Sequence, residues 1–346
     1  MAHNLEIRKG RASIAYAGET PWHKLGTKLN EAFTAAVALD QAGLNFTVEK
    51  TPIACADSRA IIPGQFAVRR TDTSDVLGVV GNYYQPLQNS DAFSFFDSVF
   101  GKDKARFECA GVLGKGENVW MLAKLPGEFR IHGEDVIGKY LLLTNNHSGK
   151  ETVRARFTPI RVVCQNTLNA AMAQKGNQIN VYHMGDPRAK LALAGKLLKD
   201  AGVYFDEAQD TFRRMAEVKL TDDQRYGYFT QTITNDTVPY VELSKPTRET
   251  VDKVQDLAQS GAGAGLPKVR GTLWGAYNAV TEWVDHVQTD KVDSGLAYMA
   301  AGRGARIKAR AFETAEEIMA GLLNRPFVPT AQTTDTDFAR LLDKPL

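Results

Sequence analysis

Cysteine is scarce in this chain, and its few cysteines lie far apart. There are three of them, Cys55, Cys109 and Cys164, and no two form a CxxC pair. This spacing excludes a disulfide framework and the usual structural zinc motifs, both of which need more or closer cysteines. It is typical of proteins in a reducing compartment, and we expect the chain to be cytoplasmic.

Long apolar runs are missing as well. Residues 1–6 lack the apolar core of a signal peptide, and no run approaches the about 20 residues that span a bilayer. We therefore expect no membrane partner. A phosphate-binding P-loop is also missing, because none of the Gly-Lys pairs is followed by the Ser or Thr that the motif requires, not even Gly138-Lys139, which has Gly133 at the required spacing before it.

Charge of one sign does not dominate the chain. Its 346 residues carry a formal net charge of +2 at pH 7, so any affinity for nucleic acid must come from local clusters of bases. Hydrophobic residues make up 43% of the chain, enough for a packed core. The length allows two domains or one large one.

The chain divides into a β-rich part and a helical part, which predicts an α+β fold. Residues 1–185 favour short strands broken by Gly, Pro and Asn, and we expect a mostly antiparallel sheet with a strand-to-helix core. Residues 107–113 and 118–124 pair naturally as a hairpin. Residues 186–325 should form a helical domain, with capping boxes at Thr221 and Thr314. Residues 326–346 should be a loosely packed tail.

The most informative segment is a basic strand that leads into a helix. Residues 136–144 form an apolar run, and the polar residues 145–150 follow as a turn that we expect to be an exposed loop. Arg154, Arg156 and Thr158 then alternate at period two, on one face of a strand. Neighbouring arginines repel each other, so an anionic partner is one reason to place them there. Residues 165–174 should form the helix.

Two clusters of bases are candidates for binding DNA. The candidate residues of the first are Asn145, Asn146, His147, Lys150, Arg154, Arg156, Arg161, Gln165 and Asn166, and those of the second are Arg303, Arg306, Lys308 and Arg310. Such clusters suit phosphates. The alternative is a solvated face whose bases pair with acids elsewhere, such as Glu313, Glu316 and Glu317.

Aromatic rings supply a second ingredient of single-strand binding, because bases stack on them. The candidate stacking rings are Trp22, Tyr83 and Tyr84. Tyr83 and Tyr84 are adjacent on an extended segment and should face opposite sides. The alternative is that these rings fill the core, as aromatic residues often do.

Catalytic patterns are weak. Cys164, His147 and Asn166 have the residue types of a thiol hydrolase, but the thiol lies at an apolar strand end, where buried and inert cysteines are common. A metal site from His132, His147 and His183 lacks any tight spacing. We therefore assign no catalytic residue, no metal and no cofactor.

Four motifs are similar to one family. They are ETPWHKLG at 19–26, NYYQPLQN at 82–89, TPIRVVCQNTL at 158–168 and WGAYNAVTEW at 274–283. They resemble the phage/plasmid-like family of bacterial, phage and plasmid proteins, which is described as a domain of unknown function. The resemblance covers nearly the whole chain and implies a setting in mobile elements. It implies no established activity.

A looser resemblance concerns the order of elements. Hairpin strands followed by a basic strand and a helix are similar to the core of single-strand annealing recombinases, which form rings around a basic groove. From this we expect a mobile-element protein that binds single-stranded DNA in annealing, recombination or replication, as a homo-oligomer and in the form of a ring. The alternatives are an enzyme of nucleic-acid or nucleotide metabolism and a host-modulating protein that binds another protein.

Overall fold

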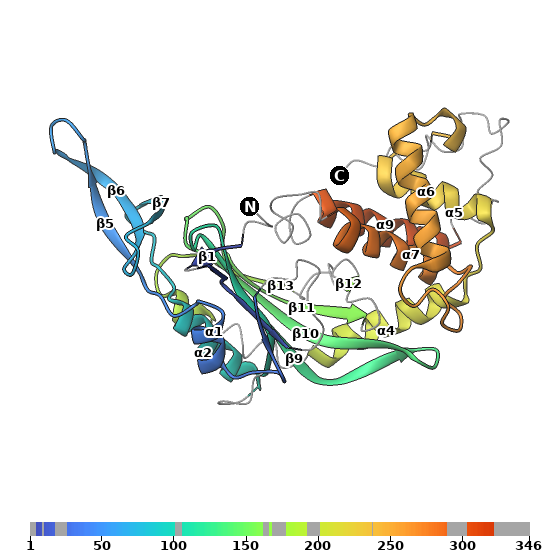
Figure 1. Ribbon diagram of the computed structural model, residues 1–346, viewed down its shortest axis with the longest axis horizontal. Coiled ribbons are helices and arrows are strands. Elements are labelled where there is room, and N and C mark those ends of the chain that lie inside the picture. The colour runs from blue at the N-terminus through green and yellow to red at the C-terminus, as the bar shows by residue number, and fades with distance from the viewer. Residues whose placement is uncertain are drawn as a thin grey trace. The chain divides into compact units, whose positions relative to one another are not determined.

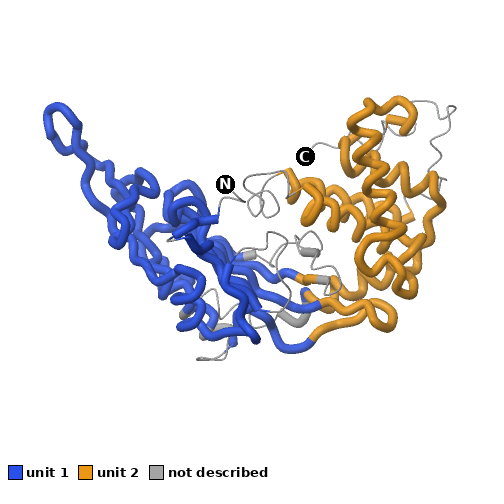
Figure 2. The backbone as a smooth tube through the Cα atoms, in the orientation of Figure 1, with its two compact units in different colours: residues 1–127, 138–158, 174–204 blue, residues 128–137, 159–173, 205–346 orange. Residues whose placement is uncertain are grey.

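The chain folds into two compact units with an α+β architecture. The computed structural model (Figure 1) describes residues 5–8, 10–17, 26–100, 106–161, 166–167, 178–191, 201–236, 238–288 and 303–321. Unit 1 comprises residues 1–127, 138–158 and 174–204, and unit 2 comprises residues 128–137, 159–173 and 205–346 (Figure 2). The sequence predicts a domain boundary after residue 185, whereas in the structure unit 1 continues to residue 204. The α+β class predicted from the sequence is confirmed.

The main sheet contains eight strands among the described residues. They are β3 (Ile14–Ala17), β4 (Thr27–Leu29), β8 (Arg106–Leu113), β9 (Asn118–Ile131), β10 (Asp135–Asn146), β11 (Val153–Arg161), β12 (Asn166–Thr167) and β13 (Gln178–Val181). Their order is β12-β11-β10-β9-β8-β3-β4, and β13 also pairs with β11. The β8–β9 pair is antiparallel, as the hairpin pattern predicts, with Leu113 opposite Asn118.

One element prediction beside this sheet is wrong. Residues 165–174 are not helical at Asn166 and Thr167, which form β12 and pair with Arg161 and Ile160 of β11. Pairing with the end of the preceding strand overrides local helix propensity here. The rest of that segment, and the tail 326–346, lie outside the described residues.

The covered face of the sheet in unit 1 packs against α1 (Ala35–Gln41) and α2 (Asn89–Phe100). The ring of Phe107 lies 4.9 Å from that of Phe93, 4.8 Å from that of Phe96 and 6.4 Å from that of Phe33. Strand alternation sends every second residue of β10 to this side, so Leu141 and Leu143 are fully buried. Leu142 and Thr144 point to the other face and are half-buried.

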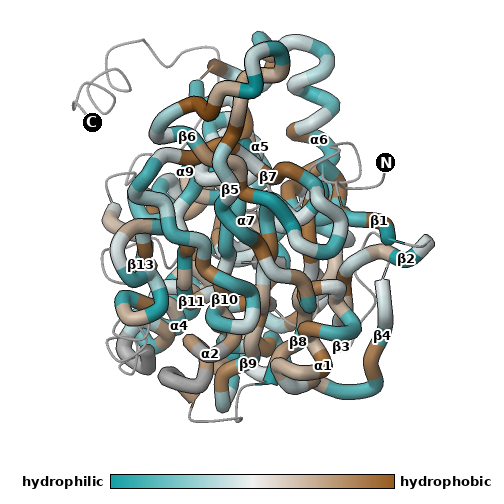
Figure 3. The backbone as a smooth tube through the Cα atoms, turned by 90° about the vertical axis from the view of Figure 1, so that its left-hand side faces the viewer, coloured by the Kyte–Doolittle hydropathy of each residue, from teal (hydrophilic) through white to brown (hydrophobic). Residues whose placement is uncertain are grey.

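A second, three-stranded sheet projects from unit 1. It consists of β5 (Val48–Ala54), β6 (Ile61–Arg70) and β7 (Val76–Gly81) in that order, all antiparallel. The β5–β6 hairpin extends beyond the end of β7 as an arm (Figure 1), and both hydrophobic and hydrophilic residues occur along it (Figure 3). A short hairpin of β1 (Ile7–Arg8) and β2 (Arg11–Ala12) precedes the main sheet.

Unit 2 is built mainly from helices. These are α4 (Ala201–Glu217, which begins in unit 1), α5 (Asp222–Thr234), α6 (Lys245–Ser260), α7 (Leu273–Glu282) and α9 (Arg303–Met319), with a short 3-10 turn η4 (Tyr240–Glu242) and a π-helix η5 (Trp283–Gln288). Trp274 is fully buried and donates from Nε1 to Oδ2 of Asp135 at 2.7 Å. None of the helices in the described part of the chain is both long enough and apolar enough to cross a bilayer.

The two capping-box predictions have different outcomes. Thr221 caps α5, with its hydroxyl accepting from the Gln224 N–H and the Gln224 side chain accepting from the Thr221 N–H. Thr314 does not begin a helix. It is buried inside α9, which starts well before it, because the apolar stripe of Ile307, Ala311 and Ala315 continues through that position.

Candidate nucleic-acid interface

The polar turn at residues 145–150 is buried, and the prediction of an exposed loop is wrong. Asn145, Asn146, His147 and Ser148 all have exposed fractions below 10%, and only Gly149 and Lys150 are exposed. Turn-forming residues predict a turn, but they do not report what packs on it. Because these side chains are buried and form hydrogen bonds inside the protein, Asn145, Asn146 and His147 are not available to contact DNA.

Asn146 organises the turn. Its Oδ1 accepts from the N–H and the hydroxyl of Ser148, at 3.0 and 2.8 Å, and from the N–H of Lys150 at 3.2 Å. Its Nδ2 donates to Oδ1 of Asn118 at 2.8 Å. An asparagine that hydrogen-bonds the backbone two residues on mimics a backbone turn. The backbone at Lys150 is therefore fixed, while its side chain points to solvent.

His147 is held in one tautomer by its surroundings. Its ring nitrogen Nε2 lies 2.9 Å from Oδ1 of Asn89, whose Nδ2 donates to the carbonyl of Leu44. The Asn89 oxygen must therefore accept, so His147 donates from Nε2. Burial lowers the pKa of His147 to about 3, and the charges of His183 and Arg70 act in the same direction. His147 is neutral at pH 7 and offers no positive charge to a phosphate.

Strand β7 covers the turn from outside. A Cβ atom at Gly78 would lie well inside van der Waals distance of the Ser148 carbonyl oxygen, and one at Gly149 would clash with Val80. Gly149 has a φ of +77°, which favours glycine. The second sheet and the turn therefore pack backbone against backbone.

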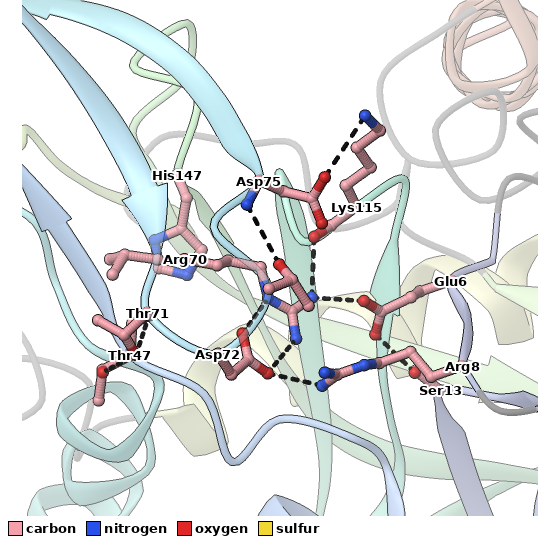
Figure 4. A network of polar contacts seen from close by, with 12 residues as sticks. Glu6, Arg8, Ser13, Thr47, Arg70, Thr71, Asp72, Asp75, Lys115 and His147 are labelled. Carbon is pink, nitrogen blue, oxygen red and sulfur yellow. Dashed lines mark hydrogen bonds and ion pairs between the residues drawn. The ribbon is translucent and has the colours of Figure 1, made fainter.

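Arg70 ties the base of the second sheet to the N-terminal hairpin. It is fully buried and forms ion pairs with Glu6 and Asp72, and it donates to the Lys115 carbonyl at 2.8 Å (Figure 4). Its guanidinium also lies 3.7 Å above the ring of Phe46. A buried arginine with this many partners is a structural charge, not a free one.

The strand arginines differ in their exposure to solvent. The Arg154 side chain is 35% exposed and forms an ion pair with Glu151 at 3.5 Å, so part of it faces solvent. Burial, followed by the charge of Arg154, lowers the pKa of Arg156 to about 10, so Arg156 stays positive at pH 7. Arg154 lies opposite Asn180 of β13. For Arg161 and Asn166 the structure describes the backbone pairing alone, and Gln165 lies outside the described residues.

Two tyrosine rings stand exposed beside the turn. Tyr83 is 79% and Tyr182 is 64% exposed, and Met184 is also exposed. They lie on two segments that pair at a bridge between Tyr84 and Met184, supported by a 2.8 Å hydrogen bond from the Gln85 N–H to the His183 carbonyl.

Tyr84 faces the opposite way from Tyr83. It is buried, its ring stacks on His183 at 4.8 Å, and its hydroxyl donates to the Asn146 carbonyl at 3.4 Å. Tyr84 is therefore not available to a base, and this candidate is corrected. Trp22 lies outside the described residues. Sequence reasoning missed Tyr182 and Met184, although Asn180, Tyr182 and Met184 alternate at period two with buried neighbours and could have been found by that signal.

The second basic cluster in unit 2 is divided between structural and exposed side chains. Lys308 is buried and donates to Oδ1 of Asp285 at 2.7 Å. Arg310 donates to the carbonyls of Thr232 and Ile233. Neither is available to DNA, which corrects both predictions. Arg303 and Arg306 are exposed.

The structure describes the three histidines of the metal pattern but only part of the thiol-hydrolase pattern. Cys164 lies outside the described residues, and His147 is engaged as above. Among described residues, no group of three or more His, Cys, Asp or Glu is placed to hold a metal ion.

A family model described as a domain of unknown function, DUF932, matches residues 76–333. The chain belongs to the DUF932 family. The DUF932 region contains Tyr83, Lys150, Arg154 and Tyr182 together with the helices of unit 2, whereas β5 and β6 precede it. No curated protein and no solved structure matches the chain.

Proposed function

We propose that unit 1 binds single-stranded nucleic acid on what we term the tyrosine surface, formed by Tyr83, Lys150, Arg154, Tyr182 and Met184. The observation that carries the proposal is the exposure of two tyrosine rings on paired segments beside the polar turn that ends in Lys150. A base can stack on each ring whatever its identity, and such stacking contributes about 1–3 kcal/mol per base.

Electrostatics around the rings favour a polyanion. Residues 145–156 and 178–191 contain Lys150, Arg154, Arg156, Arg188 and Lys190, against the two acids Glu151 and Asp186. The Asp186 carboxylate is already engaged, because it accepts from the backbone N–H groups of Arg188 and Ala189 at 3.0 and 3.1 Å. The local excess of positive charge supplies the phosphate contacts that the nearly neutral chain does not provide as a whole.

The buried turn gives this surface a fixed base. The backbone under Lys150 is held by Asn146, and the segment that presents Tyr83 is held by the Tyr84 ring and by Lys50, whose Nζ donates to the Asn82 and Tyr84 carbonyls. Groups that are held in place before binding lose less conformational entropy when a ligand arrives. The burial that removes His147 from the interface therefore supports the surface next to it.

Annealing or recombination of single strands is the more specific form of this proposal. It draws on the order of β9, β10 and the basic strand β11, and on motifs whose resemblance implies a phage or plasmid setting. The scattered cysteines, typical of a reducing compartment, favour the cytoplasm. Stacking without base readout suits a protein that must accept any sequence. The enzyme and host-modulating alternatives stay predictions from the sequence.

Binding of a fluorescent single-stranded oligothymidine, followed by anisotropy against salt, tests the proposal. Tyr83→Ala and Tyr182→Ala should each weaken binding by about 5- to 150-fold, which is about 1–3 kcal/mol, while the matched Tyr→Phe variants keep their affinity. Lys150→Ala and Arg154→Ala should each flatten the salt dependence by about 0.7 in the log–log slope.

Val241→Ala serves as the control, because Val241 is an exposed apolar residue of unit 2. Alanine variants of both tyrosines that bind as tightly as the unaltered protein would refute the tyrosine surface. Loss of thermal stability in Arg154→Ala with unchanged binding would assign that arginine to the fold instead.

Self-association is a second proposal, and the β5–β6 arm favours it. Ile61 is 67% exposed and Ile62 is also exposed, on a two-stranded hairpin that is marginally stable alone in water. We propose that this arm contacts another copy of the chain, as expected for a homo-oligomer or ring. Light scattering should show an oligomer that Ile61→Ser/Ile62→Ser dissociates, and a monomer at tens of micromolar would contradict it.

A further inference from the structure

Unit 2 contains a pocket of about 510 Å³ that the nucleic-acid proposal does not use. Its walls come from α5, α6, η5 and α9, and the lining residues that matter here are Ile233, Thr234, Pro246, Thr250, Trp283 and Arg303. A volume of this size is within the range of sites for small organic ligands. The π-helix η5 forms part of the wall, and π-helical turns occur frequently at functional sites.

Trp283 lines this pocket and carries an unpaired donor. The residue is only 4% exposed, and its buried indole N–H has no hydrogen-bond partner among the described residues. Leaving a buried donor unsatisfied costs about 1–3 kcal/mol, and tryptophan usually finds a partner when it is buried. An indole nitrogen can only donate, so the missing partner is an acceptor.

Arg303 gives the pocket a positive charge. Its neighbours on α9 are already engaged, since Lys308 pairs with Asp285 and Arg310 donates to two carbonyls of α5. Burial lowers the pKa of Arg310, and the positive charge of Arg303 lowers it further, so Arg303 adds to an already positive region. No acidic residue is present among the described residues that line the pocket.

Two threonine hydroxyls of the pocket donate to backbone carbonyls of their own helices. Thr234 donates to the Thr230 carbonyl at 2.7 Å, and Thr250 donates to the Pro246 carbonyl at 3.0 Å. Their protons are therefore used within the protein, and the strongest donors left for a ligand are the guanidinium of Arg303 and the indole N–H. Ile233, Pro246 and the indole ring offer apolar surface for the rest of the molecule.

We infer that this pocket binds a small organic oxyanion, in which a phosphate or carboxylate group accepts from Arg303 and Trp283 and a compact ring or chain lies on the apolar wall. Arginine suits both oxyanions because its planar fork matches them bidentately. The inference concerns unit 2 alone and stands independently of the tyrosine surface.

The indole N–H of Trp283 can be observed directly in the full-length protein by nitrogen-15 NMR. The chain has four tryptophans, so Trp283→Phe identifies the resonance by its disappearance. The probes are adenosine monophosphate, benzoate and adenosine. We expect a saturable shift of the Trp283 resonance with one or both anions and none with adenosine, and the comparison of the two anions distinguishes phosphate from carboxylate.

Arg303→Gln should weaken that binding at least tenfold, whereas Arg306→Gln, which removes an exposed arginine three residues along the same helix, should leave it unchanged. Unshifted resonances of the other tryptophan indole N–H groups confirm that the variants are folded. Failure of both anions to move the Trp283 resonance overturns the inference. An equal response to adenosine, or an equal loss in Arg306→Gln, also overturns it, because the apolar wall or general charge would then explain binding.

Discussion

His147 donates from Nε2 to Oδ1 of Asn89 at 2.9 Å, and neither residue is accessible to solvent. Asn89 is the first residue of α2, and His147 follows the last residue of β10. A second hydrogen bond joins the turn to the residues just before α2, because Asn145 donates to the Leu87 carbonyl at 3.1 Å. The turn is thus fastened to the start of the helix that covers the sheet.

His147→Ala should therefore destabilise the fold by about 2–4 kcal/mol, because it opens a cavity and leaves the Asn89 oxygen unpaired. Urea unfolding followed by circular dichroism measures this. Lys150→Ala, in the exposed part of the same turn, is the control and should stay within about 0.5 kcal/mol. A loss below about 1 kcal/mol for His147→Ala would restore the exposed loop that the residue types predict.

Acid should weaken the fold through the same histidine. The pKa of His147 is about 3 in the folded chain, below the ordinary value of 6.5, so the unfolded chain binds a proton first as the pH falls. Stability is then complete above about pH 6.5 and decreases by about 1.4 kcal/mol per pH unit between there and the folded pKa. Burial also lowers the pKa of His183, which acts in the same direction.

Urea unfolding at pH 7, 6 and 5 tests this, in a range where carboxylates contribute little. His147→Asn should be less stable at pH 7 and should show a flatter pH dependence than the unaltered chain. Parallel pH profiles for the two proteins would show that His147 is accessible to protons in the folded state.

The local sequence pattern was sufficient to predict those elements that depend only on neighbouring residues. The apolar run at 136–144 became β10, and the Thr221 capping box became the start of α5, because alternation and capping are properties of a few adjacent residues. The opposite facing of Tyr83 and Tyr84 follows from the same geometry of an extended chain.

The predictions that failed concern burial and pairing, which depend on contacts between residues far apart in the sequence. The burial of residues 145–148 depends on α2 and β7, which lie far away in the chain, and nothing in the turn itself indicates that Asn89 or Gly78 packs there. The sequence predicted that Lys308 belongs to an exposed basic cluster, but in the structure it is buried and pairs with Asp285. The tyrosine surface needed the pairing of residues 84 and 184, which no local pattern indicates.

The packing of β7 on the turn can be tested with a pair of glycines. Gly78→Ala should destabilise unit 1 by about 1–3 kcal/mol, because the added methyl group would overlap the Ser148 carbonyl and the backbone there must shift. Gly81 lies three residues further along the same strand, and a Cβ there would meet nothing within 4 Å. Gly81→Ala should therefore be neutral or slightly stabilising. Equal thermal midpoints for the two variants would show that β7 does not rest on the turn.

The pair of Lys308 and Asp285 gives the corresponding test in unit 2. Both side chains are almost completely buried, and Nζ lies 2.7 Å from Oδ1. Lys308→Met keeps the length of the side chain and removes its charge, which leaves the Asp285 carboxylate in the interior without its lysine partner. Breaking one partner of a buried pair costs about 3–5 kcal/mol.

Arg306→Met is the matched control, since it removes an exposed charge from the same helix and should change the free energy of unfolding by no more than about 0.5 kcal/mol. The double variant Asp285→Asn/Lys308→Met should lose less stability than Lys308→Met alone, because it leaves no unpaired charge inside. Losses that simply add in the double variant would show that the two side chains act independently. The basic cluster of α9 would then have to be reconsidered as a solvent-exposed surface, with Lys308 restored to it.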